Sequence, residues 1–332
     1  MTPIFESRDY FKPLNYDWAF QFWLQQQKMH WLPEEVPLHE DVRDWNNKLS
    51  DSERELLSQI FRFFTQGDVD VSEGYVERYL PVFRLPELRM MLLAFSNMET
   101  IHIHAYSLLL ETIGMPEAEY QAFKDIKAMA EKHLFVTGGA SEMVKGFSAE
   151  QRSAFDIAIF SAFTEGLHLF SSFAILLNFT RFGKMKGMGQ IVTWSVRDES
   201  LHVEGMLKVF REIIAQNPKI WTRTFEDRLI EICQKMVEVE DAFIDTAFAS
   251  GGIEGLTADE VKAYVRYLAD RRLLQLGSKT IYDQRTNPLP WLAEMLNAPE
   301  HANFFETRAT EYAKGGAVGD FGKDVWGVMA RN

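Results

Sequence analysis

The sequence contains a single cysteine, Cys233, among its 332 residues. One thiol cannot form an internal disulfide, and it cannot build a cysteine-rich zinc or iron–sulfur site. Cys233 lies at helical spacing in the segment IEICQKMVEV, so we expect a buried structural thiol. A lone thiol fits a reducing compartment.

Basic residues are also scarce, because 35 Lys and Arg face 48 Asp and Glu, and the net charge is −13. Binding to a phosphate backbone depends on Lys and Arg, so nucleic acid is not an expected partner. The first residues, MTPIFESRDYFKPLNYD, lack a basic segment followed by an apolar one. We therefore expect no signal peptide and a cytoplasmic protein.

Long uninterrupted apolar runs are missing as well. Residues 155–179, FDIAIFSAFTEGLHLFSSFAILLNF, are long enough to cross a membrane, but Asp156, Glu165 and His168 interrupt them. A helix buried on all sides of a large bundle explains this segment better than a membrane span. We expect no membrane association.

Runs of short alternating strands are absent, and the apolar residues recur at helical spacing almost throughout. Ser50 and Glu53 form a capping box, Gly114 ends a helical pattern, and Gly251 with Gly252 marks a break. The fold class is therefore predicted to be all-α, a helical bundle. The predicted helices cover residues 17–30, 50–80, 87–113, 117–133, 150–180, 184–215, 221–250 and 257–277.

The hydrophobic content of 46% is enough for a substantial core. We expect one helical domain over residues 1–312, with an irregular N-terminal arm at about 1–49. Residues 313–332 are glycine-rich yet carry apolar side chains, which is typical of a flexible tail that orders on a partner. Composition alone leaves open that this tail packs on its own domain.

One pattern recurs at long range. Glu-x-x-His occurs at Glu99 with His102 and again at Glu199 with His202. An acidic residue inside an apolar helix precedes each motif by 31 and 34 positions. The pattern comprises Asp68, Glu99, His102, Glu165, Glu199 and His202.

Residues three apart on a helix share a face, so each motif presents one oxygen and one nitrogen donor to a common point. Asp68 and Glu165 bring the set to four carboxylates and two imidazoles. That set suits two divalent metal ions held side by side, with bridging carboxylates and positions free for O2. It matches the ligand pattern of di-iron and di-manganese carboxylate bundles.

Two features compete with this interpretation. Arg62, Arg89 and Arg197 could neutralise the buried carboxylates as salt bridges instead of a metal pair. A third Glu-x-x-His pattern joins Glu165 to His168, so His168 is a rival metal ligand. We place His168 outside the ligand set because Glu165 already serves its helix.

Two neighbours of the motifs are candidates for further roles. Tyr106 lies four positions after His102, one turn along the same helix face, which places its phenol near the metals. A core tyrosine with a satisfied hydroxyl is the alternative. Asp198, directly before Glu199, could hydrogen-bond a ligand imidazole from outside.

Together these residues resemble the small, radical-generating subunit of class I ribonucleotide reductase, a ferritin-like di-metal protein. The similarity runs from about Trp31 to Tyr312. It rests on several segments in family order, which are WLPEEV (31–36), FTQGDVDV (64–71), SNMETIHIHAYS (96–107), FTEGLHLFSSFA (163–174), RDESLH (197–202) and NFFETRATEY (303–312).

The resemblance implies a ferritin-like bundle in which the six residues hold iron or manganese, and O2 or a reduced oxygen species activates the centre. Tyr106 takes the position of the radical-bearing tyrosine. Trp31, Asp198 and His102 would form the inner part of an electron and proton path, and Tyr312 would relay the radical outward. The family further implies a homodimer and a tail, residues 313–332, that docks on the large catalytic subunit.

This sequence departs from many family members near Tyr106. Leu169 replaces a phenylalanine found in some members, and Ser195 lies on a face that is often aliphatic. Both changes alter the polarity around Tyr106, so the oxidising equivalent could reside on Tyr106 or on the metals. A ferritin-like oxidase or desaturase with an organic substrate, or a metal-storage protein, would share the ligands.

Overall fold

The computed structural model describes residues 3–139 and 141–302. The chain divides into two units, residues 1–289 and residues 290–332, and each is described by itself. The first unit contains every predicted site residue except Tyr312. Of the second unit, one helix is described, α12 (Pro290–Ala302).

The first unit is helical, and its described residues contain only an isolated bridge between Ile253 and Leu256 in place of strands. This confirms the predicted fold class. Its helices of eight or more residues, together with the π-helical segments that extend them, are α1 (Asp17–Met29), α2 (His39–Asn47), α3 (Asp51–Gly74) with η2 (Tyr75–Tyr79), α4 (Pro86–Ile113), α6 (Lys127–Leu134) with η4 (Phe135–Gly139), α7 (Ala149–Ile157), η6 (Ala158–His168), α8 (Leu169–Arg181), α9 (Lys186–Gln216), α10 (Arg223–Ala247) and α11 (Ala258–Leu276).

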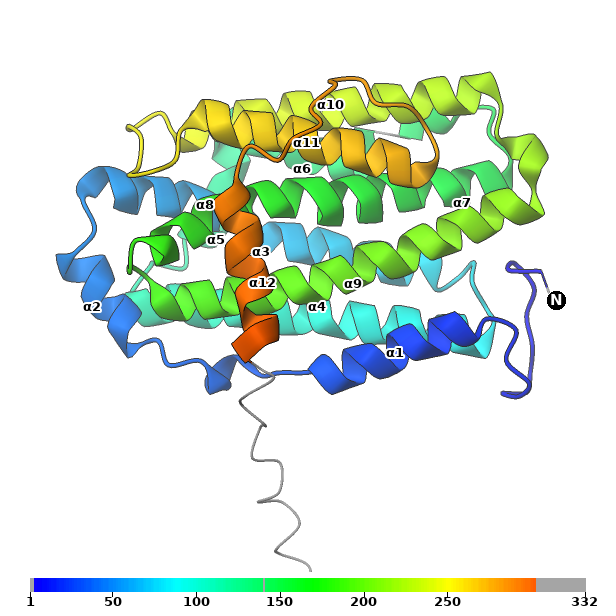
Figure 1. Cartoon of the computed structure of the whole chain (residues 1–332), viewed down its shortest axis with the longest axis horizontal. Coiled ribbons are helices and arrows are strands. Elements are labelled where there is room, and N and C mark those ends of the chain that lie inside the picture. Colours follow the sequence, from blue (N-terminus) through cyan, green and yellow to red (C-terminus); the bar gives the residue numbers. More distant parts are fainter. Residues whose placement is uncertain (1–2, 140, 303–332) are drawn as a thin grey trace, which may run out of the picture. The chain divides into compact units, whose positions relative to one another are not determined.

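Four long helical stretches form the centre of the unit: α3, α4, the continuous stretch α7–η6–α8, and α9 (Figure 1). The capping box of Ser50 and Glu53 starts α3 as predicted, and Gly114, with φ of 82°, ends α4 in the left-handed region that glycine adopts without strain. α10 and α11 pack beside η6. The bundle thus surrounds η6 with helices.

The stretch Ala149–Arg181 is long and apolar enough to cross a membrane, yet its most apolar part is entirely buried inside the protein. It begins at a capping box of Ser148 and Gln151. Because the surrounding helices already cover it, it is a core helix, as predicted.

The predicted helix at 117–133 is wrong. This segment breaks into α5 (Glu119–Ala122), η3 (Phe123–Asp125) and α6, and Ile126 between them is extended, with φ of −100° and ψ of 108°. α5 packs on α3 whereas α6 packs on α10, so the chain changes direction at Ile126. Apolar periodicity does not report such a change of packing partner.

The N-terminal arm contains the predicted helix, α1, which packs on α4, and a second helix, α2, which we did not predict. α2 supplies the missing cap of α9. The buried carboxylate of Asp41 accepts hydrogen bonds from Gly187 N at 2.9 Å and Met188 N at 2.8 Å. A carboxylate at a helix N-terminus satisfies free N–H groups and suits the helix dipole. The arm thereby anchors the helix that carries Glu199 and His202.

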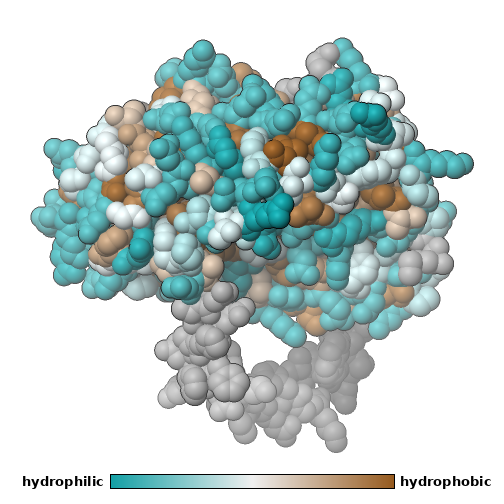
Figure 2. All heavy atoms as spheres, turned by 45° about the horizontal axis from the view of Figure 1, so that its top comes forward, coloured by the Kyte–Doolittle hydropathy of each residue, from teal (hydrophilic) through white to brown (hydrophobic). Residues whose placement is uncertain are grey.

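The face of the molecule in Figure 2 is largely hydrophilic, with apolar residues scattered among polar ones. Such scattered apolar exposure is ordinary for a globular protein. The unusual polar groups of this chain lie inside, not on the surface.

Candidate metal centre

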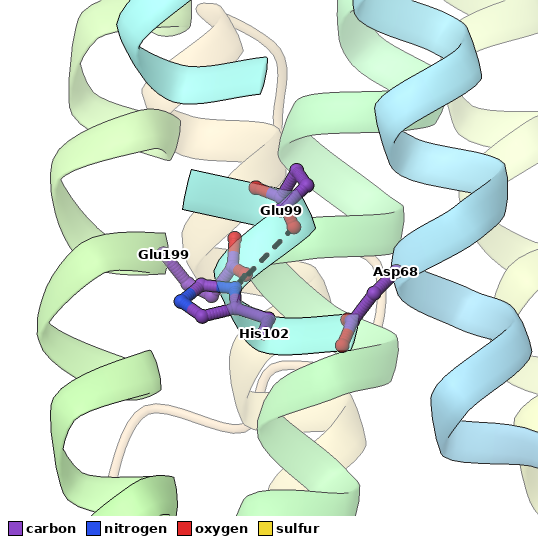
Figure 3. Close-up of side chains that lie close together, drawn as sticks. All are labelled: Asp68, Glu99, His102 and Glu199. Atoms are coloured by element: carbon purple, nitrogen blue, oxygen red, sulfur yellow. Dashed lines mark ion pairs between the residues drawn. The ribbon is translucent and has the colours of Figure 1, made fainter. Parts of the chain in front are cut away.

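Four helical stretches bring the six predicted ligands to one point in the core. Asp68 comes from α3, Glu99 and His102 from α4, Glu165 from η6, and Glu199 and His202 from α9. All six are buried, at 0–1% exposure. Figure 3 shows four of them converging from three helices. We call these six residues the metal-site cluster.

The cluster contains two groups of donors, and in each group the donor atoms lie within 4.8 Å of one another. Glu99 and Glu199 belong to both groups. Asp68 and His102 complete one, and Glu165 and His202 complete the other. Two shared carboxylates between two sets of terminal donors have the connectivity of a carboxylate-bridged pair of metal ions.

Eight nitrogen and oxygen atoms of the cluster are buried without a well-formed hydrogen bond, including both carboxylate oxygens of Glu99 and of Glu199. The other four are Asp68 Oδ2, Glu165 Oε2, His102 Nδ1 and His202 Nδ1. Some of these atoms face one another as ion pairs, with His102 Nδ1 at 3.2 Å from Glu199 Oε1 and His202 Nδ1 at 2.9 Å from Glu99 Oε1. Buried polar atoms are almost always paired, because desolvation without a partner is costly. The donor set therefore fits metal ions.

The charge balance of the metal-site cluster also favours two metal ions. If both imidazoles were protonated, two positive charges would face four carboxylates, whereas two divalent ions with neutral imidazoles balance all four. In the protein without metal, burial raises the pKa of Asp68 well above its ordinary value. Burial alone would lower the pKa of His102, but its carboxylate neighbours Asp198, Glu199 and Glu99 raise it. The centre without metal therefore retains protons.

The competing salt-bridge interpretation is wrong for the three arginines it invoked. Arg62 pairs with Glu55 and Glu119, and Arg89 is exposed. Arg197 lies 3.6 Å from Asp198 and donates to the carbonyl of Met29. None of these arginines pairs with a carboxylate of the metal-site cluster.

Both histidines direct Nδ1 into the cluster and are held from behind at Nε2. His102 Nε2 lies 3.3 Å from Asp198 Oδ2, and His202 Nε2 lies 3.1 Å from Gln26 Oε1. A partner on the far ring nitrogen fixes the orientation and tautomer of a ligand imidazole. The predicted contact of Asp198 with an imidazole is confirmed, and Gln26 is its counterpart on the other side.

Trp31 binds the same Asp198 carboxylate that holds His102. Its buried Nε1 donates to Asp198 Oδ2 at 2.8 Å, and its ring centroid lies 6.0 Å from that of His102. Burial alone would raise the pKa of Asp198, but its hydrogen bonds with His102 and Trp31 and the charge of Arg197 lower it. The structure thus brings Trp31, Asp198 and His102 together in one hydrogen-bonded series.

Tyr106 is 1% exposed, and its hydroxyl donates to Ser195 Oγ at 3.1 Å. Phe64 packs edge-on against the Tyr106 ring at a centroid distance of 4.5 Å, and Phe173 packs in turn on Phe64. Burial is the main cause that raises the pKa of Tyr106, and the nearby Asp68 adds to it. The phenol is therefore neutral and shielded from water.

His168 does not join the metal-site cluster. Its Nε2 lies 2.9 Å from the carbonyl of Met236 and 3.6 Å from Glu240 Oε2. Glu240 also pairs with Lys132 Nζ at 2.6 Å and accepts a hydrogen bond from Ser171. Burial and the charge of Lys132 lower the pKa of His168 to about 4, so it is neutral at pH 7. We call Lys132, His168, Ser171 and Glu240 the Lys132 cluster.

Three residues of the site were missed from the sequence. Phe64 and Tyr75, whose hydroxyl donates to Glu165 Oε1 at 2.8 Å, lie four positions before and seven after Asp68. That spacing places them on the face of Asp68 and was a usable signal. Gln26 lies in a run of three glutamines, and nothing in the sequence distinguishes it from its neighbours.

Tyr312, the segment NFFETRATEY and the predicted tail lie outside the described residues. Their predicted roles remain predictions.

Comparison with known proteins agrees with this geometry. The family described as "Ribonucleotide reductase, small chain" matches residues 8–288. A probable ribonucleoside-diphosphate reductase small subunit of Invertebrate iridescent virus 6 is 43% identical, over 97% of this chain and 98% of the viral one.

Two solved structures share the fold. The R2 subunit of ribonucleotide reductase from Clostridium botulinum has a TM-score of 0.79 and 24% identity, covering 87% of this chain and 91% of the other. A dimanganese(II) NrdF from Streptococcus sanguinis has a TM-score of 0.71 and 21% identity, covering 84% and 96% respectively.

The fold and the site define a ferritin-like helical bundle with a buried carboxylate and histidine centre. The chain belongs to the small-chain family of ribonucleotide reductase. Its relatives are small subunits of ribonucleoside-diphosphate reductase, an oxidoreductase that works with a large subunit. Family membership decides against the oxidase, desaturase and storage alternatives.

Proposed function

We propose that Asp68, Glu99, His102, Glu165, Glu199 and His202 hold two metal ions, which serve to generate the radical that the large subunit uses to reduce ribonucleotides. The observation that carries this proposal is the set of eight buried donor atoms without a well-formed hydrogen bond, divided into two groups that share Glu99 and Glu199. When bound, such a pair supplies the oxidising power gained from O2 or a reduced oxygen species.

Carboxylate and imidazole donors accept both iron and manganese. The Streptococcus sanguinis protein of the same fold is a dimanganese(II) form, so manganese is a candidate beside iron. Loading the protein with both ions together, followed by metal analysis, tests the choice. Two ions per chain are expected, and an absence of tightly bound metal would contradict the proposal.

We propose that Tyr106 holds the oxidising equivalent as a tyrosyl radical. The phenol must lose an electron and its hydroxyl proton together. Ser195 Oγ accepts the hydrogen bond of that hydroxyl and orients it, and the nearby Asp68 carboxylate is the base that would take the proton. The apolar ring of Phe64 and the burial of the site exclude water and reductants. Ser195 also donates to the carbonyl of Ile191, so its oxygen is free to accept from Tyr106.

Electron paramagnetic resonance after activation tests this role. The parent should give a tyrosyl signal that Tyr106→Phe removes. Tyr79→Phe should retain it, because Tyr79 is a second buried tyrosine whose hydroxyl contacts Asp156 O and Ser161 Oγ. Full ribonucleotide reduction by Tyr106→Phe would place the oxidising equivalent on the metals instead.

We propose that electrons and protons pass between His102 and the protein exterior through Asp198 and Trp31, and that Tyr312 relays them to the large subunit. The hydrogen bonds of Asp198 to His102 and Trp31 support the inner part. Reconstitution with a matching large subunit tests the outer part. Tyr312→Phe should abolish turnover and leave metal loading intact, and full turnover in that variant would contradict the relay.

The remaining proposals rest on the family. We propose a cytoplasmic homodimer whose residues 313–332 dock on the large subunit. Light scattering of the full chain measures the oligomeric state, and a synthetic peptide of residues 313–332 should compete with the chain for the large subunit.

A further inference from the structure

Among the predicted ligands, Glu165 is the only one carried by a π-helical segment. η6 (Ala158–His168) joins two α-helical stretches, and its turns are wider than those of the helices on either side. Such segments are rare and require support from their surroundings, since their backbone bonds are less regular. The side chains that hold η6 therefore decide where Glu165 lies.

Arg272 of α11 contacts this segment directly beside Glu165. Its Nε donates to the carbonyl oxygen of Gly166 at 2.9 Å, and its Nη1 donates to Gln275 Oε1 at 2.7 Å. The guanidinium lies 5.7 Å from the ring of Phe170. The residue is only 9% exposed, and none of these three described contacts is a carboxylate.

Gly166 shows how closely η6 and the Arg272 side chain of α11 pack. A Cβ at Gly166 would lie 2.4 Å from Arg272 Nε and 3.1 Å from Arg272 Cζ. Any other residue would therefore displace the guanidinium from the carbonyl that it binds. A buried cation without an acidic partner is costly, so its placement against one backbone carbonyl calls for a reason.

We propose that Arg272 is a positioning residue that holds the π-helical register of η6 and thereby directs the Glu165 carboxylate into the metal centre. Glu165 belongs to one of the two donor groups, with Glu99, Glu199 and His202. The group of Asp68, Glu99, His102 and Glu199 does not include it. Loss of the Arg272 contact should therefore weaken the binding of one metal ion more than the binding of the other. This inference rests on the proposed metal-binding function.

Calorimetric titration of the metal-free full chain with Mn²⁺, compared across variants, tests the proposal. Arg272→Gln should retain one ion and bind the second roughly 10–100-fold more weakly, as is usual when a group that orients a ligand is removed. Arg272→Lys, which keeps the charge and one donor, should give a smaller loss. The matched control is Arg271→Gln, because Arg271 is the exposed neighbour whose contacts are with Tyr267, and it should bind both ions as the parent does.

Gly166→Ala should disturb the same contact, because it adds a methyl group on the η6 side of it. It should reproduce the selective loss, and the double variant with Arg272→Gln should be no worse than either single variant, because both remove one interaction. Hydrogen exchange of the metal-free protein provides a readout without metal. Amides of 158–168 should exchange faster in Arg272→Gln, while those of α4 are unchanged.

Unchanged binding of both ions by Arg272→Gln would overturn the proposal. Equally weakened binding of both ions, with faster amide exchange throughout the bundle, would also overturn it. If the parent itself bound fewer than two ions, the proposed function would fail instead. The exchange measurement would then still decide whether Arg272 holds η6.

Discussion

Two buried clusters of glutamate and histidine lie in the same bundle and satisfy their charges differently. In the Lys132 cluster, Glu240 has a lysine at 2.6 Å and a serine hydroxyl, and the Lys132 ammonium also lies over Phe63 and Phe243. In the metal-site cluster, four carboxylates face one another with only imidazoles between them. A buried carboxylate with its own cation needs no ion from outside, whereas four without one do.

A cavity of about 10 Å³ lies beside the Lys132 cluster. Phe64 and Gly67, next to the metal-site cluster, line it together with Lys132 and His168. This volume holds about one water molecule.

The largest effect should come from removing a shared carboxylate. Glu199→Ala takes a donor from both groups, so we expect the protein to lose both metal ions, measured by metal analysis after gel filtration. Glu204→Ala, at an exposed position of the same helix, is the matched control and should still bind two. Two ions bound by Glu199→Ala would show that Glu199 is not shared.

A large effect on folding is expected in the other cluster. Lys132→Met leaves Glu240 buried without its cation and should destabilise the metal-free protein by about 3–5 kcal/mol in urea unfolding. The double variant Lys132→Met with Glu240→Gln should recover much of this loss, since it removes both charges. A double variant as unstable as the sum of the singles would show that the two residues act independently.

Intermediate effects should come from the groups behind the imidazoles. Gln26→Leu removes the hydrogen-bond partner of His202 Nε2, and we expect roughly tenfold weaker metal binding, at the lower end of the effects known for such groups. Gln25→Leu, in the same run of glutamines but exposed, should not change the affinity. Equal affinities of the two variants would indicate that His202 is oriented by packing alone.

The last prediction concerns pH. The pKa values of Asp68 and Glu165 are raised by burial, and those of His102 and His202 are raised by carboxylates that outweigh burial. A group whose pKa is raised in the folded state stabilises it below the ordinary value and loses this contribution as pH rises through the raised value. The loss begins above about pH 4 for the carboxyls and above about 6.5 for the imidazoles.

Metal ions replace these protons, so the loaded protein should not show this loss. The difference in melting temperature between loaded and metal-free protein should therefore increase with pH from 5 to 8. Each displaced proton is worth about 1.4 kcal/mol per pH unit. A difference that shrinks with rising pH would contradict the retention of protons by the metal-free centre.

Local features of the sequence were sufficient for most helices. The capping residues of α3 and the glycine after α4 act on backbone groups only a few positions away. Their effect therefore does not depend on how the helices pack. The break at Ile126 was not predictable, because it follows from α5 packing on α3 and α6 on α10. α2 was missed for a similar reason, since the role of Asp41 depends on Gly187 of α9, which lies 146 positions later.

The sequence by itself determined the two Glu-x-x-His pairs and the all-helical fold, because spacing of three on one helix fixes which side chains share a face. Only the tertiary structure decided that His168 faces Glu240 and not the metal-site cluster, that Gln26 supports His202, and that Arg272 binds the segment carrying Glu165. These contacts join residues 72 to 176 positions apart in the sequence. Such pairs are brought together by the packing of whole helices, which no local pattern encodes.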